Sequence, residues 1–348
     1  SEHAAINETV ALSKRVKQSQ ASGLVNAVLR KIQTLKLEDL LNRSEDDIQR
    51  LSVETSHPQW LLEKWLSRYT PDEVSALCSH NNTAPQTWIR RNIQIVGSED
   101  FETFLDGFDI QYKKSDVLDV FYEIDSASSL FSTKEFHSGW FSFQDLAAGV
   151  VASLLEPEAG DTIVDACSAP GGKMAFMSEL SGGQAKIIAC DASLTRLVKV
   201  RENVQRLGLK QVDVQVLDAA LAPLPEANKI LLDVPCSGTG VLNRRPDARW
   251  KRQESDITSL VDIQSNILTN SWKYLAPGGL LVYATCTLEP DENWELIDSV
   301  LEQLDHASVE AIEDENLKPY IDERGALSTL PWRHSMDGMF AVKIRKSL

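Results

Sequence analysis

Two cysteines, Cys236 and Cys286, combine a reactive side chain with a position suited to chemistry. Each follows a short apolar run, 230–234 or 281–285, that predicts a buried strand of a parallel sheet. Ligands of open α/β sheets bind just outside the carboxyl ends of the strands, so both thiols are expected at that edge. Two thiols there suggest covalent catalysis on a substrate that is attacked and later released.

A lone cysteine at the end of a strand is more often a small buried hydrophobic residue than a nucleophile. We apply that interpretation to Cys167 and Cys190, whose thiols we assign to packing. Cys236 and Cys286 differ because each belongs to an extended pattern, Asp233-Val-Pro-Cys or Thr-Cys-Thr-x-x-Pro-x-Glu-Asn.

A glycine-containing loop, Asp165-Ala-Cys-Ser-Ala-Pro-Gly-Gly-Lys173, follows another apolar run and opens a helical segment. Its glycines permit close approach of a ligand, and the start of a helix favours a negatively charged group. The next two predicted strands end at Asp191, which could pair with ribose hydroxyls, and at Asp218, placed to meet an adenine. A strand-end aspartate is often only a helix cap, but three such positions in register favour a cofactor site.

These elements require a sheet that brings their ends together. From about residue 143 onward, apolar runs alternate with helical periodicity, which predicts a doubly wound, mostly parallel α/β sheet. The predicted strands are 162–166, 186–190, 212–217, 229–234, 279–285 and 339–345, and the predicted helices are 193–207, 256–275 and 290–304. The loop 235–255 exceeds the usual connection length and is expected to be functional or disordered.

Two further regions precede the sheet. Residues 3–35 are expected to be helical, and 58–80 to hold two helices, one of them opened by Thr70-Pro71-Asp-Glu73 as N-cap, first helical residue and capping-box acid. A small α+β region is expected from strands at 88–91, 110–112 and 120–124 around a helix at 99–107, followed by a connection at 126–143. The expected domains are 1–45, 46–135 and 136–348.

The composition excludes several classes of protein. The longest apolar runs are too short to cross a membrane, and Ser1-Glu-His-Ala-Ala has no signal-peptide pattern. The five cysteines show no C-x-x-C spacing and the six histidines no H-x-x-x-H pair, so no metal site is predicted. A reducing cytoplasm fits these free cysteines best.

The charge distribution gives a mixed indication about nucleic acid. A net charge of −16 opposes phosphate binding, which favours a basic surface. The strip 243–252, however, carries five Arg and Lys residues against one Asp. A local basic strip on an acidic body is compatible with RNA binding, although it could also be an ordinary solvated loop.

Taken together, these motifs resemble those of the Sun/Fmu (RsmB) family of ribosomal RNA small-subunit cytosine-C5 methyltransferases. The matching segments are Asp165–Lys173, Asp191 with Arg196 and Leu197, Asp233–Val241, Arg244–Trp250, Tyr283–Asn293, His57–Trp60, Asn81-Asn82, Arg90 with Asn92, and Gln144-Asp145. Ser168, Val234 and Thr287 replace the family's usual Ala, Ala and Ser, and Met174 replaces a common Thr. Residues 3–33 resemble only the last helices of the family's NusB-like domain, so the front of that domain is expected to be truncated.

The resemblance implies a seven-stranded Rossmann-like domain that binds S-adenosylmethionine. It assigns the cofactor to the loop residues Cys167, Ser168, Ala169, Pro170, Gly171, Gly172 and Lys173, together with Asp191, Arg196, Asp218 and Asp233. It assigns catalysis to Cys286, which attacks cytosine C6, to Cys236, which aids release, and to Asp233, which helps hold and protonate the ring. RNA contacts are expected from Arg90, Arg244, Arg245, Arg249, Lys251 and Arg252.

The partners implied are RNA, with the target base splayed out of any stack, and no membrane, and the protein is expected to be a monomer. Transfer RNA remains an alternative substrate because its enzymes share these motifs. A DNA cytosine-C5 methyltransferase would use the Pro-Cys thiol of Cys236 as nucleophile and would not need Cys286. A non-catalytic ribosome-assembly module is the alternative from another class, against which the intact Cys236, Cys286 and Asp233 argue.

Overall fold

The computed structural model describes residues 2–16, 18–36, 38, 41–42, 44 and 46–348. They form two compact units, Ser1–Cys78 and Ser79–Leu348. The expected domain boundary at residue 45 lies outside the described residues. Residue 17, within the helical region predicted at 3–35, also lies outside them.

The first unit is helical. Its helices are α1 (Glu2–Arg15), α2 (Ser22–Gln33), α4 (Asp47–Thr55), α5 (Gln59–Leu66) and α6 (Pro71–Asn81), which crosses into the second unit. The capping box predicted at the start of α6 is confirmed, since the Thr70 N–H donates to Glu73 Oε2 at 3.0 Å. Helix α4 was not predicted, and it begins where the Asp46 carboxylate accepts the N–H of Gln49 at 2.7 Å.

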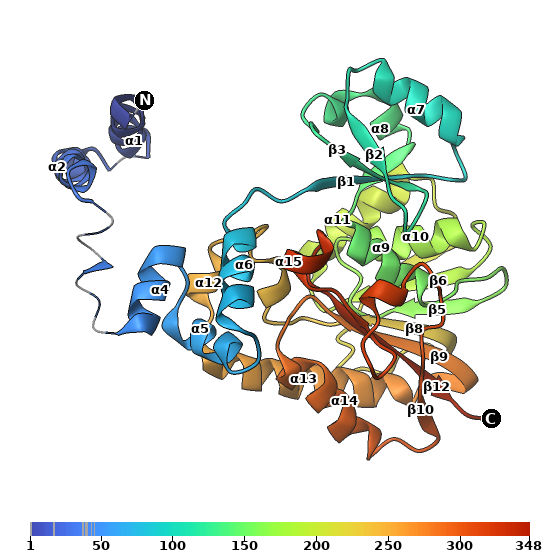
Figure 1. Cartoon of the computed structure of the whole chain (residues 1–348). Helices are drawn as coiled ribbons and strands as arrows, with labels where there is room; N and C mark the ends of the chain where they lie inside the picture. Colours follow the sequence, from blue (N-terminus) through green and yellow to red (C-terminus); the bar gives the residue numbers. More distant parts are fainter. Residues whose placement is uncertain (1, 17, 37, 39–40, 43, 45) are drawn as a thin grey trace. The chain divides into compact units, whose positions relative to one another are not determined.

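The second unit opens with a four-stranded antiparallel sheet in the order β2-β3-β1-β4 (Figure 1). Its elements are β1 (Thr87–Arg91), α7 (Ser98–Asp106), β2 (Tyr112–Lys114), β3 (Phe121–Ile124), α8 (Lys134–His137) and β4 (Phe141–Phe143). Aromatic rings, including Phe101, Tyr122 and Phe141, fill its core. The prediction of a plain connection at 126–143 is wrong, because this segment supplies α8 and the edge strand β4.

The large sheet has the order β10-β12-β9-β8-β5-β6-β7, with β11 paired to β12 (Figure 1). Its strands are β5 (Thr162–Asp165), β6 (Lys186–Asp191), β7 (Val212–Val216), β8 (Ala227–Asp233), β9 (Leu275–Thr285), β10 (Ala307–Glu310), β11 (Leu327–Ser328) and β12 (Phe340–Lys346). The neighbouring strands from β9 to β7 pair parallel, whereas β12 pairs antiparallel with both β9 and β10. The prediction of a doubly wound, mostly parallel sheet is confirmed, although β10 and β11 were not predicted.

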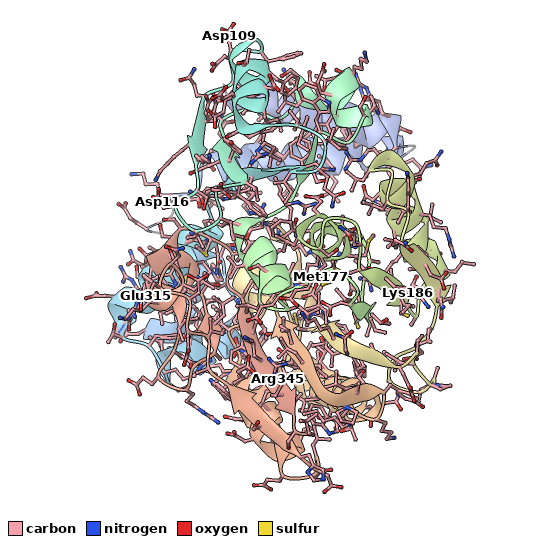
Figure 2. The ribbon with its side chains drawn as sticks, turned by 90° about the vertical axis from the view of Figure 1, so that its right-hand side faces the viewer. Asp109, Asp116, Met177, Lys186, Glu315 and Arg345 are labelled. Carbon is pink, nitrogen blue, oxygen red and sulfur yellow. The ribbon has the colours of Figure 1, made fainter. Side chains whose placement is uncertain are left out.

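Helices cover both faces of the large sheet and give two separate apolar cores. One face is covered by α9 (Leu146–Ser153), α10 (Gly172–Leu180) and α11 (Leu194–Arg206), and the other by α13 (Glu254–Trp272) and α14 (Trp294–Leu301). The chain reverses its strand order between β5 and β8, the point at which α/β sheets open a ligand crevice. Figure 2 labels Lys186 at the start of β6 and Arg345 near the end of β12. Both lie at the end of the sheet opposite the carboxyl ends of the parallel strands.

Candidate active site

The two cysteine side chains meet at the carboxyl ends of β8 and β9, which are neighbouring strands. The Cys236 and Cys286 sulfurs lie 3.0 Å apart, and the Cys286 N–H points at the Cys236 sulfur from 3.2 Å. The hydrogen bond to Cys286, followed by burial, raises the pKa of Cys236 well above the usual thiol value. Cys236 is therefore a neutral thiol at neutral pH.

A buried carboxylate, Glu292, holds the two cysteine loops together. Its side chain is fully buried and accepts the Ser237 N–H at 2.8 Å and the Gln264 amide at 2.8 Å. The Ser237 hydroxyl also bonds Glu292 and lies 2.6 Å from the Thr287 hydroxyl. Glu292 was noted only as part of a motif, because nothing in its sequence position shows that it reaches across to the other loop.

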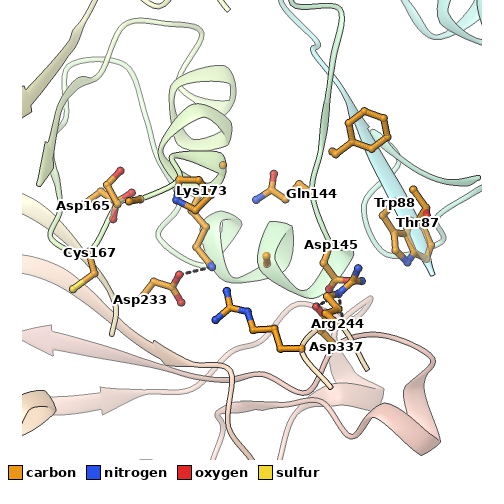
Figure 3. A pocket seen from close by; sticks show the side chains of 17 residues that line it. Thr87, Trp88, Gln144, Asp145, Asp165, Cys167, Lys173, Asp233, Arg244 and Asp337 are labelled. Atoms are coloured by element: carbon orange, nitrogen blue, oxygen red, sulfur yellow. Dashed lines mark hydrogen bonds and ion pairs between the residues drawn. The ribbon is translucent and has the colours of Figure 1, made fainter. Parts of the chain in front are cut away.

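An ion pair, Lys173 with Asp233, lies beside the thiols, with 2.6 Å between the Lys173 Nζ and the Asp233 carboxylate (Figure 3). Burial opposes the charge of Lys173, but the neighbouring Asp233 outweighs it and raises the lysine pKa. At the end of β5, burial raises the pKa of Asp165 to about 7, and the nearby Asp233 charge adds to this rise. The site therefore combines an ammonium group paired with Asp233 and a buried carboxyl group, Asp165, that holds a proton more readily than an ordinary aspartate.

A cavity of about 640 Å³ connects the thiols to the predicted cofactor residues, and we call it the catalytic cavity. Its lining includes Cys236, Cys286, Asp191, Asp218 and Lys173. A volume of this size is typical of a site for a cofactor together with part of a substrate. Most of the expected cofactor residues after β5, β6 and β7 line this one space, whereas Ser168, Gly171 and Gly172 do not.

The loop after β5 is shaped for a ligand with a ribose and a charged end. Gly171 has φ +100°, which excludes most side chains. Arg196 donates to the Ala169 carbonyl at 3.0 Å and lies 3.3 Å from Asp191, whose carboxylate also caps the turn by accepting the Ser193 N–H. An acid at this strand end and backbone N–H groups at the start of α10 suit S-adenosylmethionine.

The residues expected to contact RNA are placed differently from one another. Arg90 and Arg249 were predicted at the RNA surface, but both are buried, with 0 and 4% of their surfaces exposed. Arg90 pairs with Glu179 at 2.6 Å, and Arg249 donates to Asn82 Oδ1 at 2.7 Å. Desolvating an arginine requires such partners, so both guanidinium groups are buried and paired in this structure, and their contact with RNA stays a prediction.

The remaining basic residues lie closer to the cavity or to solvent. Arg244 is held between Asp145 and Asp337, with 2.7 Å to each carboxylate. Arg252 donates to the Cys236 carbonyl at 3.2 Å and so supports the thiol loop. Lys251 forms an exposed pair with Asp247, and Arg245 is exposed. Among the described residues, no cluster of His, Cys, Asp or Glu could hold a metal ion.

The sheet order, the loop after β5 and the strand-end acids define a Rossmann-like methyltransferase that depends on S-adenosylmethionine. The chain belongs to the family described as 16S rRNA methyltransferase RsmB/F, whose model matches residues 152–345. The RsmF/B-like ferredoxin-like domain matches residues 57–127, and the NusB family matches residues 1–34. The family resemblance predicted from the motifs is therefore confirmed.

Individual relatives agree with the family assignment. The chain is 34% identical to the Ribosomal RNA small subunit methyltransferase B of Cronobacter sakazakii over 99% of its own length and 78% of that protein. A solved structure titled PH0851 matches with a TM-score of 0.87 and 26% identity, covering 96% of this chain and 75% of that chain. NSun6 from Pyrococcus horikoshii, solved with SFG, shares the fold at a TM-score of 0.76 and 23% identity, covering 84% and 98%.

No helix in the described part of the chain combines the length and apolarity needed to span a membrane. The family match and the relatives together show an RNA methyltransferase of the RsmB/F family that uses S-adenosylmethionine.

Proposed function

We propose that this protein methylates carbon C5 of a cytosine in small-subunit ribosomal RNA through a covalent bond between Cys286 and C6. The observation that carries the proposal is the pair of thiols 3.0 Å apart beside the Lys173–Asp233 ion pair. C5 of cytosine is a poor nucleophile, and addition of a thiolate at C6 makes it enamine-like. A single thiol would suffice for addition, so the second thiol points to a separate release step.

In the first step, the Cys286 thiolate forms a bond to C6, and the C5–C6 electron pair shifts into the ring. The proton that the ring then takes up at N3 comes from the Lys173–Asp233 pair, which lies next to the thiols. Lys173 is suited to this because its charge is retained in a buried setting, and it also stabilises the anion of Cys286. S-adenosylmethionine, held by the loop after β5 with Asp191 and Asp218, supplies the electrophilic methyl group.

In the release step, the C5 proton must leave, the C5–C6 double bond forms again, and the bond from C6 to the Cys286 sulfur breaks. The first cause of the raised pKa of Cys236 is its hydrogen bond to Cys286. That hydrogen bond weakens once the Cys286 sulfur is bonded to carbon, so the pKa of Cys236 falls in the covalent complex. Cys236 then gives its own proton to solvent and, as a thiolate, accepts the C5 proton, while the Cys286 sulfur leaves as a thiolate and N3 returns its proton to the Lys173–Asp233 pair.

The first test is transfer of labelled methyl groups to total RNA, followed by mapping of 5-methylcytosine. Methylation confined to transfer RNA, or at a position other than C5, would overturn the proposed substrate or chemistry.

We expect the protein to act as a monomer in the cytoplasm, where ribosomal RNA is found, and we keep the division into 1–45, 46–135 and 136–348 as a proposal.

The second test separates the roles of the thiols on a denaturing gel with RNA and cofactor. Cys286→Ala should abolish turnover and give no protein–RNA adduct. Cys236→Ala should also stop turnover but accumulate a denaturant-resistant adduct, because release fails after methyl transfer. Cys190→Ala, which changes a buried cysteine outside the site, is the matched control and should behave as wild type. The reverse pattern, with an adduct only for Cys286→Ala, would make Cys236 the nucleophile, as in the DNA enzymes.

A further inference from the structure

A second cavity, of about 410 Å³, opens beside the catalytic cavity, and we call it the side cavity. The two cavities share Lys173, Asp233, Arg244 and Arg245 in their linings, so they are neighbouring parts of one space. Figure 3 shows the side cavity running from the Lys173–Asp233 pair toward Thr87 and Trp88 on β1. None of the steps described above uses the far half of this space.

We propose that the side cavity binds the nucleobase next to the target cytosine in the RNA chain, and that it favours a base with an exocyclic amino group. The inference rests on the proposed function for the place of the target base beside the thiols. With the target there, its neighbour along the RNA is separated by a single phosphodiester and must lie within reach of the adjoining space.

The apolar wall of the side cavity suits a base. It is formed by Trp88 and Phe143, and the half-buried Phe143 ring stacks on Phe131 with 4.3 Å between ring centroids. Phe131 is 51% exposed, so an aromatic surface continues from the cavity to solvent. Bases of single-stranded RNA are commonly held by stacking on such rings.

The charged floor of the side cavity excludes a phosphate. Arg244 is shared by the carboxylates of Asp145 and Asp337, whose side chains are 9 and 10% exposed. One guanidinium between two carboxyl groups leaves no net positive charge to attract a phosphate, but it leaves oxygen atoms that accept hydrogen bonds. An amino group of adenine, guanine or cytosine can donate to them, whereas uracil offers no amino group.

Donors without partners complete the lining. The Trp88 indole N–H and the Gln144 side-chain NH₂ are buried and have no hydrogen-bond partner among the described residues. Gln144 is held in place because its amide oxygen accepts from Arg90. Buried donors usually find an acceptor, and ring nitrogens and carbonyl oxygens of a base supply one.

The phosphate that links the two nucleotides has a separate place. Arg245 lines both cavities, is exposed, and has no ion pair within 4 Å among the residues that the structure describes. It therefore lies where the linking phosphodiester must pass. Arg244 and Arg245, adjacent in sequence, would bind different parts of the RNA.

The test uses short single-stranded RNAs that carry one central cytosine in a uridine background. The nucleotide on either side of the cytosine is adenosine, guanosine, uridine or an abasic ribose, and binding is measured by fluorescence anisotropy. An amino-bearing base on one side should raise affinity about tenfold over uridine or the abasic ribose. Phe143→Leu should remove most of the preference over the abasic ribose, because this ring stacks on any base. Phe143→Tyr should restore that preference, and Phe108→Leu, which changes an exposed ring in the turn after α7, should leave it intact.

Equal affinity for all flanking nucleotides on both sides, or a preference that Phe143→Leu leaves unchanged, would overturn the inference. Formation of 5-methylcytosine in the same RNAs is followed separately. A flanking preference without 5-methylcytosine would overturn the proposed chemistry and leave the base site standing. Methylation without any flanking preference would overturn the base site and leave the proposed chemistry standing.

Discussion

Arg90 and Arg244 each pair with carboxylates far away in the sequence, Arg90 with one in a buried core and Arg244 with two at the floor of a cavity. Arg90 is fully buried, pairs with a single carboxylate, Glu179, and lies 4.7 Å from the centre of the Phe176 ring. The Arg244 side chain is 31% exposed and is shared between Asp145 and Asp337. The first network is buried and pairs one cation with one carboxylate, whereas the second has a surplus carboxyl group and lines the side cavity.

This difference separates a supporting role from a binding role. Besides Glu179, Arg90 donates to the Gly172 carbonyl at 3.1 Å and to Gln144, so it ties β1 of the small sheet to the first turn of α10. Arg90 therefore supports the start of α10, after the loop that follows β5, and does not line either cavity. The Arg244 network instead presents acceptor oxygens and a titratable group to whatever enters.

The largest expected effect is the loss of stability when the buried Arg90–Glu179 pair is broken. Arg90→Met leaves Glu179 as a buried carboxylate without its partner and should lower the free energy of unfolding by about 3–5 kcal/mol. Arg90→Met with Glu179→Met should recover most of this stability in denaturant titrations, because no charge is left buried. Calorimetry should still show weaker S-adenosylmethionine binding in the double variant, since Gln144 and Gly172 have lost Arg90. Full recovery of cofactor affinity would show that the ion pair acts on stability alone.

Breaking the ion pairs of Arg244 with Asp145 and Asp337 should lower the free energy of unfolding less, and this loss should depend on pH. Arg244→Met should lower the free energy of unfolding by about 2–3 kcal/mol near pH 8, because two nearly buried carboxylates lose their cation. The loss should shrink near pH 5, where Asp145 and Asp337 can take up protons and no longer need it. A loss that is the same at both pH values would contradict the assignment of Arg244 to these carboxylates.

Asp337 itself should set a pH slope of stability. Burial and the neighbouring Asp145 charge raise its folded-state pKa to about 7, against 3.8 in a model compound. The folded protein then keeps a proton that the unfolded chain has lost, so this group makes stability fall as pH rises from about 4 to 7. Asp337→Asn should remove roughly 2 kcal/mol of that decline between pH 5 and 7. If the free energy of unfolding changes with pH in the same way in wild type and Asp337→Asn, the raised pKa is refuted.

The smallest effect on stability is expected next to Arg244 in sequence. Arg245→Ala should change the free energy of unfolding by less than about 0.5 kcal/mol, because the side chain is exposed. It should lower the slope of log affinity for single-stranded RNA against log salt by about 0.7, the value for one phosphate contact. Lys318→Ala, which removes an exposed pair with Glu315, is the control for general loss of charge. A slope that is the same in wild type and Arg245→Ala would remove Arg245 from the RNA path.

Local patterns predicted much of the large sheet. Strands β5, β6 and β8 lie within a few residues of their predicted ranges, because buried parallel strands are short, continuous apolar runs. Helix α9 was missed since its Leu, Ala, Gly and Val residues are apolar on every side and show no helical period. Strand β4 was missed because it has three residues and exists only as a partner of β1.

The thiols, their strand ends and the cofactor loop were determined by the sequence alone, because each depends on a short stretch of chain whose residue types limit its conformation. Only the tertiary structure decided how far the sulfurs lie apart and which arginines reach solvent. A buried charge must find a partner, and for Arg90 that partner, Glu179, is 89 residues away. Such pairings depend on how the two sheets pack, which no local pattern records.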